Sequence, residues 1–432
     1  MEVSPGSTPT PNNDSRRQFL KTSTLLGGAL ATGGLTLPRS VHAAGSDTLK
    51  AALIGCGGRG NGAAKNATVG DSNLKITVLA DVFPDKVEAS RSILKRTLGD
   101  RMEVPDENCF SGFDAYKQVM ETDVDVVLLC TTPHFRPAHL RAAIESGKHV
   151  FCEKPVAVDA PGCRHVMETV QQAKEKNLSI VSGLCWRYAP SVVETVNRIK
   201  DGAIGEVIAM QENYLAGTLW QRPREEGWSE MEYQIRNWLY YTWLSGDHNV
   251  EQHIHSLDKA LWIMDDEPPA RCFGLGGRQV RTDPKFGNIY DHHAVCYEYD
   301  SGTKVFAYTR QMAGCYNDTE DYIMGSKGNS RVLKGEITGV NPWKYDGPGG
   351  NMYDLEHQAL YNGIRSGNIV NDGVYMTRST MMAIMGRMAT YTGKQLTWDE
   401  AWNSQEDYTP KSYEWGDVEV PAVAMPGQTK FV

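Results

Sequence analysis

A glycine-rich turn between an apolar run and a helix-compatible segment constrains the fold of this chain more than any other feature. Residues 49–54 read LKAALI, and they are followed by Gly55, Cys56, Gly57, Gly58, Arg59 and Gly60. In a strand–turn–helix unit the first glycine of GxGxxG permits a tight turn. The second lets a pyrophosphate approach the backbone, and the third lets helix and strand pack closely. The pattern predicts a dinucleotide-binding Rossmann unit that begins near Leu49.

A carboxylate stands where such a unit binds a ribose. The apolar run LKITVLA ends at Asp81, 21 residues after Gly60. At this point a carboxylate can hydrogen-bond a ribose 2′-hydroxyl and repel a 2′-phosphate. NAD is therefore expected as the cofactor in preference to NADP, and Arg59 is the one nearby cation in the sequence that could weaken that preference.

Strand-like and helix-like segments alternate after Asp81. Residues 84–98 have a helical pattern, and residues 124–131 form an all-apolar run suited to a strand buried on both faces. Residues 137–147 read as a helix closed by glycine, and HVFC follows as the next strand. This order predicts an α/β fold with a right-handed, doubly wound parallel sheet over residues 48–185.

The pattern changes after residue 185. Strand-like segments occupy residues 206–214, 270–280, 294–299 and 304–310, with few long helices between the last three. We expect an α+β substrate domain over residues 186–395 with an open, mainly antiparallel sheet, and an extended tail over residues 396–432. An exposed open sheet favours a homodimer or homotetramer. The aromatic and arginine-rich stretch 218–243 suits either carbohydrate faces or ordinary core packing.

Acids and histidines are concentrated in residues 246–262. Glu251, His255, Asp258 and Trp262 have the spacing of one helical face. His255 is the candidate general base or acid, because hydride transfer from an alcohol requires removal of the hydroxyl proton. Two alternatives stay open, a structural hydrogen-bonded cluster and a zinc-type metal site of His248, Glu251 and His255. Catalysis without a metal is the favoured interpretation.

The glycine turn, the segment GKHVFCEKPVA (147–157) and the acid–His–acid helix resemble the glucose–fructose oxidoreductase, inositol dehydrogenase and MocA family. The resemblance covers about residues 48–395. The sequence differs from the family pattern at Glu251, where the family carries Asp. The resemblance implies an NAD-dependent oxidoreductase that acts on a sugar, polyol or glycoside.

The same resemblance assigns roles to particular side chains. It places the Glu153–Lys154–Pro155 turn, with a possible cis peptide, beside the nicotinamide, and it gives the substrate proton to Lys154 and His255 with Glu251 as modulator. It also implies that Thr132, His134, Trp186 and Arg187 border the cofactor, and that Tyr188 and Asp258 face the substrate.

The N-terminus resembles a twin-arginine export signal. Residues 15–21 read SRRQFLK, a short apolar stretch follows, and cleavage is expected after Ala43. This address implies that the twin-arginine machinery exports a folded, cofactor-loaded protein to the periplasm. Because no pool of free NAD is replenished there, the NAD should stay bound and return to its starting state in each cycle.

Two catalytic functions fit such a cycle, and a third possibility involves no catalysis. A second sugar could take the hydride back, or the hydride could return to the same molecule. The second route describes a redox-neutral glycoside hydrolase that works by oxidation at C3, elimination, hydration and re-reduction. The third possibility is a non-catalytic, sugar-binding member of the fold, against which the intact Lys154 and His255 argue.

Composition excludes other classes. The formal charge is −9, with 44 Lys and Arg against 53 Asp and Glu, and the sequence shows no basic stripe. A nucleic acid partner is therefore not expected. No segment beyond the signal reaches membrane-spanning length. The nine cysteines form no CxxC pair, which favours free, buried thiols over a disulfide framework.

Overall fold

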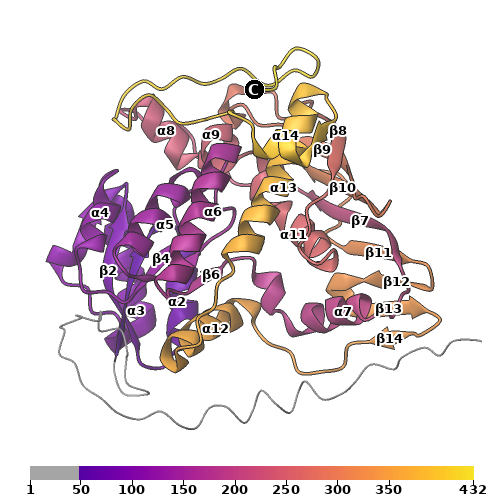
Figure 1. Ribbon diagram of the computed structural model, residues 1–432. Helices are drawn as coiled ribbons and strands as arrows, with labels where there is room; N and C mark the ends of the chain where they lie inside the picture. The colour runs from indigo at the N-terminus through magenta and orange to yellow at the C-terminus, as the bar shows by residue number, and fades with distance from the viewer. Residues whose placement is uncertain (1–47) are drawn as a thin grey trace, which may run out of the picture. The chain divides into compact units, whose positions relative to one another are not determined.

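Two β-sheets organise residues 48–432, the part of the chain that the computed structural model describes (Figure 1). The first sheet is parallel and six-stranded, in the order β3-β2-β1-β4-β5-β6. Its strands are β1 (Leu49–Ile54), β2 (Leu74–Asp81), β3 (Cys109–Ser111), β4 (Val126–Leu129), β5 (His149–Cys152) and β6 (Ile180–Ser182). The strand order reverses between β1 and β4, as in a doubly wound fold. The predicted Rossmann architecture is confirmed.

Helices cover both faces of this sheet. They are α2 (Gly58–Gly70), α3 (Pro84–Leu98), α4 (Ala115–Met120), α5 (Arg136–Glu145) and α6 (Ala160–Glu175), joined by α12 (Met352–Ser366) from late in the chain. Leu53 and Leu128 pack with α2, α3 and α12 on one face, whereas Ile54 and Val127 pack with α4, α5 and α6 on the other. Strands buried on both faces explain why β1 and β4 are apolar throughout.

The second sheet has nine strands in the order β14-β13-β12-β11-β7-β10-β9-β8-β15. They are β7 (Val207–Ala216), β8 (Arg271–Gly277), β9 (His292–Glu298), β10 (Lys304–Gln311), β11 (Asp321–Gly325), β12 (Gly328–Arg331), β13 (Glu336–Gly339), β14 (Trp343–Lys344) and β15 (Leu396–Thr397). The pair β7 and β10 is parallel, and the other pairs are antiparallel. The predicted open, mainly antiparallel sheet is confirmed.

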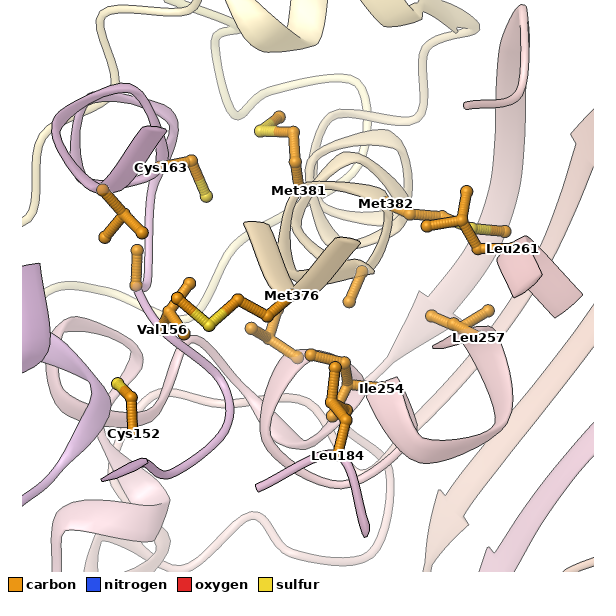
Figure 2. Close-up of a cluster of buried hydrophobic side chains, with 14 of the residues drawn as sticks. Cys152, Val156, Cys163, Leu184, Ile254, Leu257, Leu261, Met376, Met381 and Met382 are labelled. Atoms are coloured by element: carbon orange, nitrogen blue, oxygen red, sulfur yellow. The ribbon is translucent and has the colours of Figure 1, made fainter. Parts of the chain in front are cut away.

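Two helices connect the parallel sheet to the second sheet through a shared core. These are α11 (Ile254–Ile263) and α13 (Gly373–Thr392). Figure 2 shows Met376, Met381 and Met382 of α13 among side chains of both parts: Cys152, Val156, Cys163, Leu184, Ile254, Leu257 and Leu261. Burial of an aliphatic side chain contributes about 1.5–3 kcal/mol. This packing fixes α11, and the histidine on its first turn, relative to the end of β5.

The remaining helices are α7 (Pro190–Lys200), α8 (Glu230–Arg236), α9 (Thr242–Ser245), α10 (His248–Glu251) and α14 (Trp398–Trp402). Residues 403–432 contain no helix or strand and run along the top of Figure 1 above α8 and α14. The extended tail therefore begins at residue 403 rather than 396, because β15 pairs with β8 and α14 has a capping box.

Two sequence predictions concern the chain as a whole. All nine cysteines are free, as predicted. Within the described residues, no helix has the length and apolar character needed to cross a membrane. The twin-arginine segment and its cleavage site lie in residues 1–47, outside the described part of the chain.

Candidate cofactor and active site

A cavity of about 640 Å³ opens at the carboxyl ends of the parallel strands. This is where ligands bind in open α/β sheets. Many of the residues singled out in the sequence line it: Gly55, Gly57, Gly58, Arg59, Gly60, Asp81, Thr132, Glu153, Lys154, Glu251 and His255. The fold thus brings the glycine turn together with side chains that come from nearly two hundred residues later.

The glycine turn has the shape that a dinucleotide requires. Gly55 has φ +99°, and a Cβ there would lie 2.5 Å from the backbone of Cys130. A Cβ on Gly60 would lie 1.9 Å from the Gly55 oxygen, so strand and helix meet too closely for any other residue. By contrast, no atom lies within 4 Å of a Cβ placed on Gly57 or Gly58. This open space at the N-terminus of α2 suits a pyrophosphate.

Asp81 ends β2 at the rim of the cavity. Its Oδ2 accepts a hydrogen bond from the Cys56 backbone N–H at 2.7 Å, and its Oδ1 accepts one from the Phe83 N–H at 3.0 Å. A carboxylate has about four acceptor positions, so capacity remains for ribose hydroxyls. Burial raises the pKa of Asp81 above its usual value. Lys86 also lines the cavity and is the cation whose charge acts on Asp81.

Arg59 does not take the role expected of it beside Asp81. Its guanidinium forms ion pairs with Glu153 and with Glu356 of α12, and it lies 4.7 Å from the centre of the Tyr353 ring. These partners hold it at the β5 end of the cavity. The cation whose charge acts on Asp81 is Lys86, which no motif in the sequence marked.

Lys154 is held by an acid from the other half of the chain. The Lys154–Pro155 peptide is cis, as the resemblance suggested. The Lys154 Nζ donates to the Glu251 backbone oxygen at 2.6 Å and to Glu251 Oε1 at 3.1 Å. An ammonium has three donors, so one remains for a substrate oxygen. Glu251 thus fixes the direction in which Lys154 points.

His255 faces the same cavity as a neutral imidazole. Burial holds its pKa well below the usual value, and the positive charges of Lys154, Lys259 and Arg59 lower that pKa further. Its Nδ1 is buried and has no hydrogen-bond partner among the described residues. The ring lines the cavity, and a neutral imidazole can accept a proton from a substrate hydroxyl.

The expectation of one continuous helical face through Glu251 and His255 is wrong. Helix α10 ends at Glu251 and α11 begins at Ile254. Between them the His253 N–H bonds to the His248 oxygen, and the His255 N–H bonds to the Gln252 oxygen, so the i→i−4 ladder is interrupted. Glu251 and His255 still line one cavity, although they belong to different helices.

Asp258 lies away from the cavity and does not face a substrate. Its carboxylate accepts from Arg187 Nε and Nη2 at 2.9–3.1 Å, and from the Ser379 hydroxyl at 2.7 Å. Arg187 also pairs with Asp266 at 2.6 Å. The hydrogen bonds of this pair are used inside the protein, so both residues support the fold rather than the ligand.

The other three residues from the resemblance also lie outside the lining of the cavity. Tyr188 donates its hydroxyl to Asp372 at 2.7 Å. The ring of Trp186 lies 5.3 Å from the Lys259 ammonium. His134 lies 2.8 Å from the Tyr413 hydroxyl, and burial lowers its pKa to about 4. Thr132, from the same loop as His134, does line the cavity.

The metal alternative of His248, Glu251 and His255 does not form. His248 turns into the core, where its Nδ1 lies 2.7 Å from Asp247 Oδ1, and His293 is the next neighbour. Asp247 Oδ2 already accepts from the Tyr391 hydroxyl at 2.5 Å and the Tyr290 N–H at 2.9 Å. The carboxylate is saturated by these donors, which favours a structural hydrogen-bonded cluster here.

Four aromatic residues that line the cavity carried no readable signal in the sequence: Phe83, Phe113, Phe135 and Tyr353. The aromatic and arginine-rich stretch, for which a carbohydrate face was one of two interpretations, adds Trp220, Arg222, Ile235, Arg236 and Trp238. That stretch divides between the two readings, since its Tyr240, Tyr241 and Trp243 are buried in a core cluster. Which aromatic ring faces a cavity depends on tertiary packing and not on spacing along the chain.

Two distant segments cover the Asp81 end of the cavity. Arg236 of α8 donates to Asp85 at 2.9 Å and lies 3.8 Å from the centre of the Phe83 ring. From the tail, Trp415 stacks on Phe83 at 5.5 Å and contacts Phe113 at 4.9 Å. The Met231 N–H bonds to the Gly416 oxygen and ties the tail to α8.

Residues 49–181 match the profile of the Gfo/Idh/MocA family, an oxidoreductase family with an NAD-binding Rossmann fold. Residues 49–181 thus form an NAD-binding Rossmann domain similar to that of the Gfo/Idh/MocA family, and NAD is its cofactor, as the sequence predicted.

Relatives of known name share parts of the chain. The 2,7-anhydro-N-acetylneuraminate hydratase of Escherichia coli is 27% identical over 219 residues, which is 50% of this chain and 53% of the relative. A glycosyl hydrolase family 109 protein of Shewanella pealeana is 25% identical over 283 residues, 60% of each chain. The chain thus spans little more than half the length of these relatives.

The fold likeness extends further. The structure of an aldose–aldose oxidoreductase from Caulobacter crescentus, complexed with glycerol, aligns with a TM-score of 0.62 at 18% identity. The alignment covers 81% of this chain and 100% of that one. The two chains therefore share the architecture of a Rossmann domain followed by an open sheet.

Proposed function

We propose that this protein is an NAD-dependent oxidoreductase that acts on a sugar, polyol or glycoside and keeps its NAD bound through each cycle. One observation carries the proposal. A single cavity contains the glycine turn and Asp81 at one end, and Lys154, Glu251 and His255 at the other. The first group suits a dinucleotide, and the second suits a hydroxyl that loses its proton.

The residues divide the chemical work. NAD, when bound, supplies the acceptor for a hydride. Lys154 donates a hydrogen bond to the substrate hydroxyl oxygen with its free N–H, while Glu251 keeps the ammonium in place. His255 accepts the hydroxyl proton, because burial and neighbouring cations keep its imidazole neutral. This pairing places a proton acceptor beside a donor that stabilises the developing alkoxide.

Retention of NAD is supported by the cover over the Asp81 end. Arg236 lines that end of the cavity, and Trp415 of the tail packs on Phe83 and Phe113, which also line it. A retained cofactor fits the export address in residues 15–21, and we propose a periplasmic location reached by the twin-arginine route. The exposed face of the second sheet supports a homo-oligomer through Phe273 and Leu275, which are 45% and 78% exposed.

A redox-neutral glycoside hydrolase is the second candidate. It is favoured by the names of the two relatives, a hydratase and a family 109 glycosyl hydrolase. The same site suits it, because oxidation at C3 makes the C2 proton acidic and a neutral His255 could also accept that proton. A cycle that returns the hydride to the same molecule needs no exchange of NAD.

The test starts from protein purified without added NAD. After dialysis, absorbance and fluorescence should still report about one bound NAD per chain, and an empty protein that needs millimolar NAD would contradict the proposal. Two offered sugars should then exchange hydride. Release of the aryl group from aryl glycosides without external NAD would instead select the hydrolase.

A further inference from the structure

One helical turn beyond His255, α11 carries a buried ammonium. Lys259 is 1% exposed. Its Nζ donates to the His255 backbone oxygen at 2.6 Å and forms an ion pair with Asp321 Oδ2 at 3.2 Å. A fully buried lysine is rare unless it is paired. Lys259 thus links the first turn of α11, which carries the proposed proton acceptor His255, to Asp321 in the second sheet.

The sheet presents two carboxyl groups to this ammonium. Glu212 of β7 and Asp321 of β11 are direct partners in the antiparallel register, so both side chains leave the same face. Both residues are 0% exposed. Among the described residues, no N–H or hydroxyl group donates a hydrogen bond to their four carboxyl oxygens, and the ion pair from Lys259 reaches only Asp321.

Charge balance decides the protonation of this cluster. Two ionised carboxylates with one ammonium would leave an unpaired negative charge in the interior, which desolvation strongly disfavours. Arg331 does not balance this charge, because it pairs with the neighbouring Glu320 at 3.6 Å. Burial and the neighbouring Asp321 raise the pKa of Glu212 well above its usual value. One proton held on Glu212 would leave a single negative charge to pair with Lys259.

We propose that Lys259 is a positioning residue for His255, and that Glu212 and Asp321 share one proton to keep Lys259 charged. Lys259 holds the His255 carbonyl directly after the interrupted ladder at residues 252–253, and its charge keeps the imidazole neutral. The inference rests on the proposed function, in which His255 accepts the substrate proton.

The charge on Lys259 acts alongside others around the imidazole. The charges that act on His255 are those of Lys154 after β5, Arg59 on α2 and Lys259 itself, and Glu251 on α10 lines the same cavity. Asp321 on β11 reaches this group only through its ion pair with Lys259. Lys154 has a carboxylate beside it in Glu251, and Arg59 has Glu153 and Glu356. Removal of Lys259 leaves these groups in place, so its contribution can be measured separately.

The decisive variant is Lys259→Met, which keeps most of the side-chain volume without the charge. An NMR titration of isotope-labelled histidine reports the pKa of His255, whose signal is assigned by its loss in His255→Asn. The pKa should rise by about one unit, and the acid limb of kcat/KM should move toward neutral pH by the same amount. Lys148→Met is the matched control, because Lys148 is also a buried lysine but binds the carbonyls of Thr122 and Val124 at the opposite end of the parallel strands.

Shared protonation predicts an unusual pattern in the acids. In Glu212→Gln or Asp321→Asn the remaining acid ionises and pairs with Lys259, so each single variant should keep the wild-type pKa of His255. The double variant leaves the ammonium without a counter-ion and should unfold at a clearly lower temperature. Adding Lys259→Met to the double variant removes that charge, so the triple variant should recover stability while its His255 pKa stays raised.

The outcomes separate the two proposals. An unchanged His255 pKa in Lys259→Met, or in the triple variant if the single one fails to fold, would overturn the positioning role. Single acid variants as damaged as the double variant would overturn the shared proton. A raised pKa in a protein that turns over no sugar would leave the positioning intact and refute the proposed function.

Discussion

In the proposed reaction the Lys154 ammonium binds the substrate hydroxyl, and two of its three N–H donors already bind Glu251. Lys154→Ala should lower kcat/KM at least about 100-fold, since a positioned proton-handling group contributes 10²–10⁴-fold. Bound NAD should persist, because the glycine turn and Asp81 are untouched. Steady-state kinetics with a cofactor assay checks both. Lys75→Ala at the surface is the control, and near-normal turnover in Lys154→Ala would refute the assignment.

Asp81 is the residue expected to favour NAD over NADP. Asp81→Asn removes the charge that repels a 2′-phosphate, while Lys86 stays in the cavity to attract one. We expect NADP binding to strengthen about tenfold, which corresponds to about 1.4 kcal/mol. Competition between NAD and NADP during exchange measures the ratio. Adding Lys86→Ala should cancel the gain, and an unchanged ratio in Asp81→Asn would contradict the role of the carboxylate.

Elements far apart in sequence act together over the cofactor. Helix α8 and the tail meet at the Met231–Gly416 hydrogen bond, and their side chains converge on Phe83. Arg236 and Trp415 both contact Phe83, which lines the cavity, so both segments support the same wall of the cofactor site. The cover therefore depends on the C-terminal segment reaching back to the first domain.

The tail prediction follows from this arrangement. Trp415→Ala removes two ring contacts, each worth about 0.5–1.5 kcal/mol, so NAD should be lost in dialysis about tenfold faster. Timed dialysis with fluorescence detection measures the rate. Tyr316→Ala, at an aromatic side chain that is 72% exposed, is the matched control. Equal loss rates in Trp415→Ala and wild type would show that the tail does not retain the cofactor.

At the scale of the molecule, the second sheet leaves one face open. Leu275 and Tyr308 both pair with Ala294 across neighbouring strands, so they lie on the same face, and they are 78% and 38% exposed. Leu275→Asp should convert the homo-oligomer to smaller species in light scattering, because a charge would be buried at the contact. Val340→Asp, at a residue 70% exposed, should not. A wild-type monomer would refute this interface.

Acid stability is also a property of the whole fold. Burial lowers the pKa of His139 and His253 to about 3, and that of His134 to about 4. In the unfolded chain histidine titrates near pH 6.5, so the unfolded state binds more protons below that pH. Each of these residues then lowers the free energy of unfolding by about 1.4 kcal/mol per pH unit. Denaturant melts should show stability falling from pH 6.5 to 4, and a flat profile would contradict neutral burial.

The sequence by itself determined the Rossmann unit and one end of the site. Gly55, Gly60 and Asp81 are tied to local geometry, and parallel strands carry their C-terminal residues to one edge, so the turn, Asp81 and Lys154 could be placed together without coordinates. The strands β7 to β10 of the second sheet were readable in the same way, because period-two burial is a local pattern, whereas the short strands β11 to β15 were not predicted.

Only the tertiary structure decided which charged side chains face the cavity. Arg187 pairs with Asp258 and Arg59 pairs with Glu356, partners that lie 71 and 297 residues away along the chain. Spacing along the sequence carries no information about such pairs, because a buried charge pairs with whichever opposite charge the fold brings beside it. For the same reason nothing in the sequence indicated that Lys259 pairs with Asp321 beside Glu212. Tertiary packing also decided that Glu251 and His255 lie on two helices and line one cavity.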